Sequence, residues 1–255
     1  MTTSQITLTV VLLFAGILAC LEIGLWLGRR GAEGTGKAFT PLAGAVFALM
    51  GLLLAFTFSG AAARYELKRQ LIVSETNAIE TAYLRIDLLP AARQAQQRDN
   101  FRQYLDSRLA FYRNIADSDA ARAEAVRFAA LQREIWSEAI TACQQGCADP
   151  QAVFVLSSLN AMIDITTNRA VALQTHPPAI VFALLAMLPL ICALLAGFDA
   201  GGKGRSLIHM LGFAVILTIT IFIILDYEYP RAGYFISLDS TDQLLANLRA
   251  SMSHH

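Results

Sequence analysis

Residues Ala55–Pro90 read AFTFSGAAARYELKRQLIVSETNAIETAYLRIDLLP. The stretch begins with apolar residues of the kind that cross a membrane, and it ends with charged residues of the kind found in water. After Gly60 it holds neither glycine nor proline until Pro90, so no residue inside it interrupts a helix. The stretch therefore predicts one helix that leaves a bilayer and continues into the aqueous phase.

The composition is that of a membrane protein. Of the 255 residues, 55% are hydrophobic and 16% are charged, whereas an ordinary soluble domain has about 25% charged residues. The net charge is zero, which gives no sign of a nucleic-acid partner. Four apolar runs reach the roughly 20 residues that a membrane crossing needs, and they are Ile6–Gly28, Leu42–Ala63, Ala179–Phe198 and Leu207–Leu225.

These runs divide the chain into four parts of an all-α, polytopic membrane protein with four transmembrane helices. Residues 1–63 form a first transmembrane hairpin, and residues 178–228 form a second. Residues 64–177 lie between them as an extramembrane helical bundle whose first helix continues from the second span. Residues 229–255 form a C-terminal turn and a short amphipathic helix. Two hairpins place both short loops on one side of the membrane, and the bundle and both termini on the other.

The bundle is expected to consist of four helices. The apolar seam of the first recurs at intervals of four and three residues, which is helical spacing, and consists of Ile72, Thr76, Ile79, Tyr83 and Ile86. Its opposite face is expected to carry Lys68, Gln70, Glu75 and Arg85. Joined to the second span, this helix makes one rod from Pro41 to Leu89. The other helices are expected at Ala92–Ile115, Ala121–Cys143 and Gln151–Gln174.

Small residues recur along one face of each of the first two spans. They are Gly16, Cys20, Gly24 and Gly28 in the first span, and Gly44, Ala48, Gly51, Ala55, Ser59 and Ala62 in the second. Such stripes let helices approach closely in lipid, so packing within one chain explains them. Alternatively, the second span lines a pore or a subunit interface. The pore-lining candidates are then Ala48, Gly51, Ala55, Phe56, Thr57 and Ser59, because apolar rings can gate a channel by dewetting.

Charged residues gather where two spans leave the membrane on the side of the bundle. The cluster consists of Arg64, Glu66 and Lys68 after the second span, and of Asp226 and Glu228 at the end of the fourth. Because these residues lie at similar depth, Arg64 or Lys68 is expected to pair with Asp226. The cluster is either ordinary salt bridging at helix ends or, in an oligomer, a ring of acidic residues that selects ions.

Polar residues form a stripe on each of two bundle helices. Ser74, Asn77 and Thr81 lie on the first, and Ser157, Asn160, Asp164 and Asn168 lie on the fourth. The stripes predict a buried polar seam if they face each other, and a hydrated vestibule if they face a symmetry axis.

Signals of catalysis are absent from the sequence. It contains no P-loop, no GxSxG, no HExxH and no glycine fingerprint after a strand, so we expect neither an enzyme nor a cofactor. Cys143 and Cys147 are spaced CxxxC and lack a nearby histidine apart from His176, which argues against a zinc site or another metal centre. They are either a short disulfide in an oxidising compartment or two free thiols.

Two stretches resemble signature segments of a bestrophin-like bacterial family of membrane proteins. One begins FTFSGAAARYELKRQ, and the other reads LDYEYPRAGYFISLDSTDQLLANL. In the second, Asp226, Glu228, Pro230 and Gly233 match a closing motif of two acidic residues, a proline and a glycine. Tyr229 departs from that motif, which usually has an arginine before the proline. The resemblance covers most of the chain and implies two membrane hairpins with a helical insert.

The resemblance extends by analogy to the true bestrophins, which are oligomeric anion channels with four spans per subunit and a pore lined by the second span. Arg64, Tyr65 and Glu66 are similar to a charged and aromatic cluster that follows that span in bestrophins. The resemblance therefore implies a homo-oligomer in membrane lipid that conducts ions. It does not identify the ion or the number of subunits.

The two orientations of the chain have different support. Arg29, Arg30, Lys37, Lys203 and Arg205 crowd the short loops, and the positive-inside rule then puts the bundle and the termini in the periplasm. The bestrophin analogy implies the reverse. The leading hypothesis is an oligomeric ion channel of the bacterial inner membrane, with its bundle in the periplasm. The alternative is a non-conducting envelope scaffold or sensor that binds a partner through the bundle.

Overall fold

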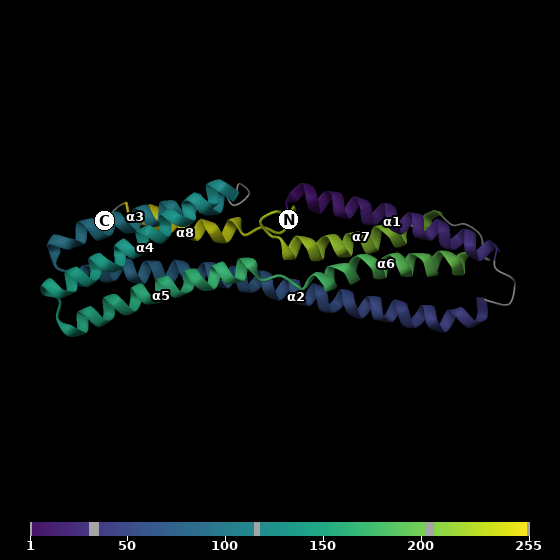
Figure 1. Ribbon diagram of the computed structural model, residues 1–255, viewed down its shortest axis with the longest axis horizontal. Coiled ribbons are helices and arrows are strands. Elements are labelled where there is room, and N and C mark those ends of the chain that lie inside the picture. Colours follow the sequence, from purple (N-terminus) through teal and green to yellow (C-terminus); the bar gives the residue numbers. More distant parts are fainter. Residues whose placement is uncertain (1, 31–35, 115–117, 202–206, 254–255) are drawn as a thin grey trace. The chain divides into compact units, whose positions relative to one another are not determined.

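The computed structural model describes residues 2–30, 36–114, 118–201 and 207–253 (Figure 1). Within these ranges the chain is helical and contains no strand. The helices are α1 (Thr3–Arg30), α2 (Gly36–Leu84), the 3-10 helix η1 (Arg85–Leu88), α3 (Ala91–Arg113), α4 (Ser118–Gly146), α5 (Asp149–Gln174), α6 (Ala179–Ala200), α7 (Leu207–Glu228) and α8 (Asp239–Ser251). The all-α class is confirmed, and four helical stretches are long and apolar enough to cross a membrane.

The helix α2 is unbroken over 49 residues. It ends at Leu84, five residues before the end expected from the sequence. The chain then tightens into η1, where the backbone N–H of Leu89 donates to the carbonyl of Ile86 at 2.9 Å. Pro90 follows, and it cannot donate the backbone hydrogen bond that a continuing helix needs. Prolines also separate α5 from α6, because Pro177 and Pro178 lie in the break between them.

The chain forms two compact units. The first comprises Met1–Tyr65 and His176–Ser237, and the second comprises Glu66–Thr175 and Leu238–His255. The four apolar helical stretches supply the first unit with α1, α6, α7 and the first part of α2. The second unit contains the rest of α2, the helices α3, α4 and α5, and the C-terminal helix α8. Lys203 and Arg205 of the short loops lie outside the described residues.

In the first unit, α1 and α6 touch through their backbones. A Cβ added to Gly197 would lie 2.1 Å from the carbonyl oxygen of Leu21, and one added to Gly24 would lie 2.1 Å from that of Leu194. Gly28 meets Phe198 in the same way. As in other membrane helix bundles, small residues allow the two backbones to approach closely, because no large side chain lies between them.

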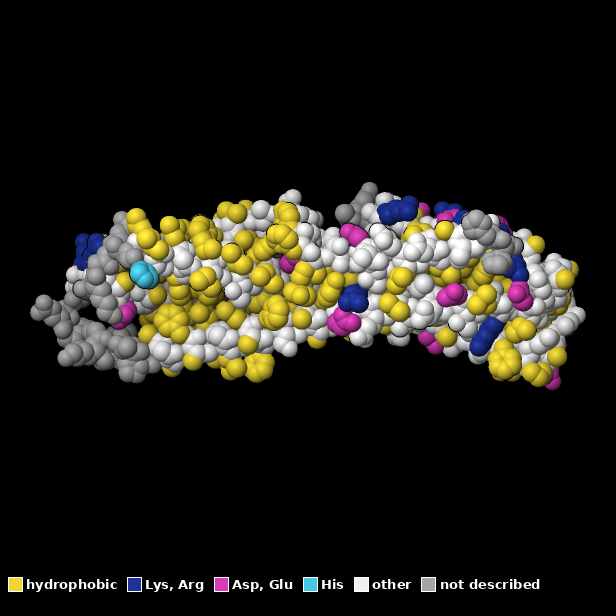
Figure 2. All heavy atoms as spheres, turned by 180° about the vertical axis from the view of Figure 1, so that it is seen from behind, with side chains coloured by type: hydrophobic (Ala, Val, Ile, Leu, Met, Phe, Trp, Pro, Cys, Tyr) yellow, Lys and Arg dark blue, Asp and Glu magenta, His cyan; other side chains and the backbone are white. Residues whose placement is uncertain are grey.

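The surface of the first unit suits hydrocarbon. Large apolar side chains point outward along its helices, among them Leu12, Ile180 and Ile216. On the face drawn in Figure 2, hydrophobic side chains cover most of this unit. In a soluble protein such a surface would be an aggregation hazard, whereas in a bilayer it is the lipid-facing side.

The second unit has its own core, built from all of its helices. The largest fully buried side chains of this core include Phe101, Tyr104, Ile135 and Met162. Leu245 and Leu248 of α8, and Met252 directly after it, belong to the core. Arg249 of α8 also forms a two-pronged ion pair with Asp106 of α3, with both N–O distances at 2.9 Å. The C-terminal amphipathic helix is thus part of the bundle.

We expect the replacement of Gly197 by alanine to destabilise the first unit. Its Cβ cannot fit 2.1 Å from the Leu21 carbonyl oxygen unless the two backbones separate. Overpacking of this kind costs about 1–3 kcal/mol, which is measurable as a lower melting temperature of the purified protein in detergent. Gly212→Ala on α7 is the matched control, because nothing lies within 4 Å of its added Cβ. Equal melting temperatures for the two variants would contradict the backbone contact.

Candidate functional site

The small-residue face of α2 differs from that of α1. Among the described residues, no atom beyond the adjoining backbone of α2 itself lies within 4 Å of a Cβ added to Gly44 or Gly51, and Ala48, Ala55 and Ser59 are exposed. The glycines of α1 are occupied by α6, so packing within one chain explains the stripe of α1. It does not explain the stripe of α2, whose small residues face outward from the single chain.

Two other candidates for the pore lie on the same stretch of α2. Phe56 is 67% exposed, and its ring therefore projects away from the chain. Thr57 is partly buried, and its hydroxyl donates back to the carbonyls of Leu53 and Leu54 at 2.7 and 3.1 Å. Phe56 and Ser59 thus present a large apolar group and a small polar group one turn apart, and Thr57 faces the protein more than its neighbours do.

Glu228 is the centre of the charged cluster at the membrane exit. Its side chain is 1% exposed, and it accepts two hydrogen bonds from the Arg64 guanidinium at 2.7 and 2.9 Å. Its other oxygen lies 2.8 Å from Nδ1 of His176. The ring of His176 also lies 4.9 Å from that of Tyr229. Burial together with the charge of Glu228 raises the pKa of Tyr229, so the phenol stays neutral beside the carboxylate.

The expected pairing of Arg64 or Lys68 with Asp226 is wrong for Arg64, which pairs with Glu228. Asp226 instead accepts three backbone N–H groups, those of Tyr234 at 2.6 Å, Phe235 at 3.1 Å and Ile236 at 2.8 Å. It therefore folds the turn after α7 back onto the end of that helix. A side chain at position 233 would prevent this, because a Cβ added to Gly233 would lie 2.5 Å from Oδ1 of Asp226.

These contacts give three of the four residues of the closing motif separate tasks. Asp226 ties down the backbone of the turn, Gly233 leaves room for that carboxylate, and Glu228 binds Arg64. Sequence reasoning missed His176. The available signal was its position directly before Pro177 and Pro178, at the start of the second hairpin and therefore near the membrane exit.

The remaining members of the charged cluster lie in the second unit. Glu66 accepts hydrogen bonds from Arg69 at 3.4 Å and from Gln70 at 3.2 Å, both on the same helix. Lys68 is buried with 6% exposure, although the sequence placed it on a polar face. The cluster therefore does not act as one set: Glu66 makes ordinary surface pairs within its helix, while Lys68 belongs to the interior.

The two polar stripes of the bundle face outward from the single chain. Ser74, Asn77 and Thr81 of α2 are exposed, as are the polar residues of α5 in the second stripe, which are Ser157, Asn160, Asp164 and Asn168. The amide of Asn160 donates to Asp164 at 2.9 Å within the same helix. This exposure is inconsistent with a seam buried between two helices of one chain.

A buried ionic cluster lies in the second unit, and the sequence did not predict it. Glu75 was assigned to the polar face of its helix, but it is fully buried, and its two oxygens bind Arg108 of α3 and Arg169 of α5. Arg108 also donates to the hydroxyl of Tyr112. Asp242 of α8 lies 3.9 Å from Arg169. One carboxylate thus connects three helices of the bundle, and a second carboxylate extends the cluster to α8.

The surroundings of Arg108 favour its charged form. Burial lowers the pKa of Arg108, but Tyr112, Glu75 and Tyr104 together outweigh it and raise that pKa above its ordinary value. Tyr104 is buried as well, and burial is the largest cause of its raised pKa. Its hydroxyl lies 3.2 Å from that of Thr166 and 3.3 Å from the amide of Gln132. These shifts favour a cationic Arg108 and a neutral Tyr104.

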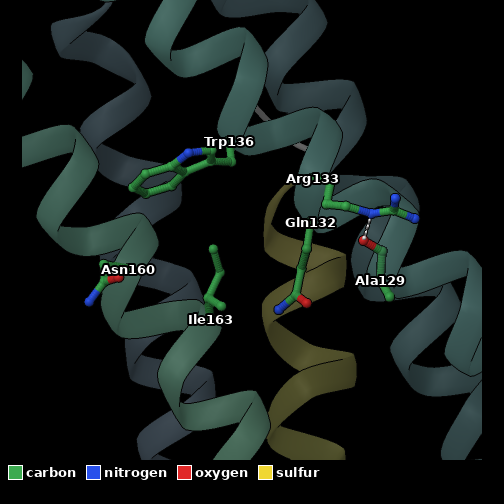
Figure 3. Close-up of a pocket in the computed structure, with 6 residues that line it drawn as sticks. All are labelled: Ala129, Gln132, Arg133, Trp136, Asn160 and Ile163. Carbon is green, nitrogen blue, oxygen red and sulfur yellow. Dashed lines mark hydrogen bonds between the residues drawn. The ribbon is translucent and has the colours of Figure 1, made fainter.

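A pocket of about 370 Å³ lies between α4 and α5 (Figure 3). Its wall includes Trp136 and Ile163. Arg133 points away from Trp136 in Figure 3, and its Nε donates to the carbonyl of Ala129 at 3.3 Å. Gln132 is already bonded to Thr166 at 3.1 Å. The polar groups of this pocket therefore do not converge on a common point.

Other chemistry is sparse in the part of the chain that the structure describes. It holds no group of three or more histidine, cysteine, aspartate or glutamate side chains placed to bind a metal ion. Cys143 and Cys147 are free thiols. Burial and the neighbouring thiol raise the pKa of Cys143 to about 12, so it is a poor nucleophile near neutral pH.

Four apolar spans and a helical bundle define the chain as a multi-pass α-helical membrane protein. Residues 9–236 match the Bestrophin-like domain, and the chain belongs to the Bestrophin-like family. This confirms the identification made from the two sequence motifs.

Solved structures show the same fold. A bacterial bestrophin homologue from Klebsiella pneumoniae, solved by zinc anomalous phasing, is similar with a TM-score of 0.70 and 15% identity, covering 98% of this chain and 99% of the other. A single-residue variant of the Klebsiella pneumoniae homologue gives a TM-score of 0.69 and 14% identity, covering 98% and 100%. No curated protein matches the chain.

We expect Glu75→Gln to destabilise the bundle strongly. The substitution keeps the shape of the side chain but leaves Arg108 and Arg169 buried without their shared carboxylate. Breaking a buried ion pair from one side costs roughly 3–5 kcal/mol, which unfolding in denaturant would measure. Glu80→Gln, an exposed site on the same helix, should change the free energy of unfolding by less than about 0.5 kcal/mol. Equal losses in both variants would show that the cluster contributes nothing specific.

Proposed function

We propose that the protein is an oligomeric ion channel of the bacterial inner membrane, with α2 lining the pathway. The outward small-residue face of α2 is the observation that carries this proposal. Its glycines have open space around them. This face of α2 therefore packs against a neighbouring copy of the chain, lines the ion pathway, or does both. Membership of the Bestrophin-like family, together with the resemblance to the bestrophin channels, supports the same function.

The narrowest part of the pathway is assigned to the turn of α2 from Phe56 to Ser59. Phe56 is the large exposed side chain on this stretch. A ring of such side chains in an oligomer forms an apolar constriction, and such constrictions open and close by dewetting. Ser59 offers a small hydroxyl one turn later. Ala48, Gly51 and Ala55 continue the face towards the other end of the span with side chains too small to obstruct it.

The role of an ion-selecting ring does not suit Glu228. Both of its oxygens are engaged within one chain, by Arg64 and by His176, and it is almost completely buried. We assign Glu228 and Asp226 to the structure of the membrane exit instead. The exposed polar stripes of the bundle, which include Asn77 and Asn160, are assigned to a hydrated vestibule that continues the pathway.

Single-channel recording in planar bilayers tests the pathway. Phe56→Ala should raise the conductance at least twofold, because it widens an apolar constriction. Ser59→Leu should reduce it to less than a tenth, because it adds a branched apolar group beside that constriction. Ile216→Ala on α7 is the matched control: its side chain is 67% exposed, as is that of Phe56, and its removal should leave the conductance unchanged.

Two results would overturn the proposal. Purified protein that light scattering shows to be monomeric, and that carries no current, would favour the non-conducting scaffold. Currents that respond to Ile216→Ala as much as to Phe56→Ala would remove α2 from the pathway.

We further propose that the bundle and both termini lie in the periplasm, on the basis of the basic residues around the short loops, which include Arg29 and Arg30. Cysteine labelling tests this orientation. Cys143 is a poor reporter because of its raised pKa, so Gln144→Cys, at an exposed position beside it, is introduced after all native cysteines are replaced by alanine. An impermeant maleimide should label Gln144→Cys in intact spheroplasts. Labelling only after lysis would place the bundle in the cytoplasm.

A further inference from the structure

The aromatic residues of the first unit mark the two surfaces of the membrane. At one end the hydroxyl of Tyr234 lies 2.7 Å from that of Thr7. At the other end Arg30 stacks on Trp26 at 3.7 Å. The 19 helical steps from Thr7 to Trp26 span about 28 Å, close to the roughly 30 Å of a bilayer's hydrocarbon core. Tyrosine and tryptophan are enriched at membrane–water interfaces. We therefore place one membrane surface at Tyr234, which we call the tyrosine level, and the other at Trp26.

A crevice of about 440 Å³ opens between α1 and α6, with α7 at its base. We call it the α1–α6 crevice. Its lining includes Leu12 and Gly16 of α1, Ala186 and Leu190 of α6, Ile221 of α7, and Tyr229, which directly follows α7. Since Gly16 is near the middle of α1 and Tyr229 follows α7 at the tyrosine level, the crevice lies within one leaflet.

The glycine contacts of α1 and α6 explain why the crevice exists. Near Gly24 and Gly197 the two backbones touch. At Gly16, two turns nearer the tyrosine level, the closest atom to an added Cβ is the side-chain tip of Leu190 at 3.1 Å. The backbones are therefore already separated there by a side chain. Beyond Gly16 the helices stay apart, and the space between them is the crevice.

The surroundings decide what fills this space. The walls are apolar apart from Thr9 and Tyr229, and the hydroxyl of Thr9 already donates to the carbonyl of Gln5 at 2.8 Å. A buried water needs two to four polar partners, and the depth of the crevice does not offer them. An empty space would forfeit the dispersion contacts of its walls. Hydrocarbon is the filling that satisfies both conditions.

A second copy of the chain is too large a partner for the crevice alone. A stable protein interface buries about 800 Å² on each partner, and the crevice exposes far less surface than that. Its volume falls in the range of roughly 300–1,000 Å³ that binds small ligands. We propose that the α1–α6 crevice binds one acyl chain of a phospholipid from the leaflet at the tyrosine level. This inference does not depend on whether the protein conducts ions.

Photolabelling with a lipid tests the proposal. The full-length protein is reconstituted in vesicles of phosphatidylethanolamine and phosphatidylglycerol that contain a trace of phosphatidylcholine with a mid-chain diazirine. After illumination, the photolabel should be found mainly in the peptides that contain Leu12 and Ile221. Ala186→Trp fills the crevice and should reduce this labelling at least fivefold. Ala183→Trp is the matched control, because Ala183 is exposed on the same helix but does not line the crevice. The lipid probe should label this variant to the same extent as the unchanged protein.

Labelling spread evenly over the exposed leucines, or unaffected by Ala186→Trp, would overturn the proposal. A second measurement guards against misfolding of the tryptophan variant. A photoreactive amino acid replaces Leu12 in the otherwise unchanged protein in the same vesicles. We expect its adducts to carry the mass of a phospholipid, and a cross-link to a second copy of the chain would show that protein covers the crevice instead.

Discussion

The structure depends on the requirement that a chain in hydrocarbon must satisfy its own backbone hydrogen bonds. Only a helix or a closed barrel does so, and the four apolar stretches of this chain are helical. In α2 the same requirement continues to be met after the chain becomes polar, because no glycine or proline interrupts it between Gly60 and Pro90. The α-helix therefore continues past the apolar run as far as Leu84, and a 3-10 turn leads from it to Pro90.

The two units hold their helices together by different means. In the first unit, where lipid is as apolar as leucine, burial of apolar surface cannot drive association between helices. Gly24 and Gly197 instead bring α1 and α6 into backbone contact. In the second unit, aromatic and aliphatic side chains form an ordinary core, and Glu75 is placed inside it between two arginines. A buried cluster of this kind strongly penalises the loss of any one partner, and so constrains which faces of the helices can meet.

The glycine contacts of the first unit have two further consequences. They use the small-residue face of α1 within the chain, whereas no described helix covers Gly44 and Gly51 on the corresponding face of α2. They also bring the backbones of α1 and α6 into contact around Gly24 and Gly28, whereas at Gly16 the side chain of Leu190 lies between the two helices. The proposed subunit face and the proposed lipid crevice thus both follow from the positions of the glycines in α1, α2 and α6.

The sequence by itself determined the helices, the spans and the family. These depend on local properties: hydropathy over about 20 residues, spacing of three and four, prolines that end helices, and two short motifs. The tertiary structure alone decided the partners. Asp226 and Glu228 are two residues apart and chemically alike, yet one binds three backbone amides and the other binds Arg64 and His176. From the sequence, Glu75 is interpreted as a charge exposed to solvent, because its partners Arg108 and Arg169 lie 33 and 94 residues away along the chain. Spacing along one helix cannot reveal a partner that only the folding of other helices brings near.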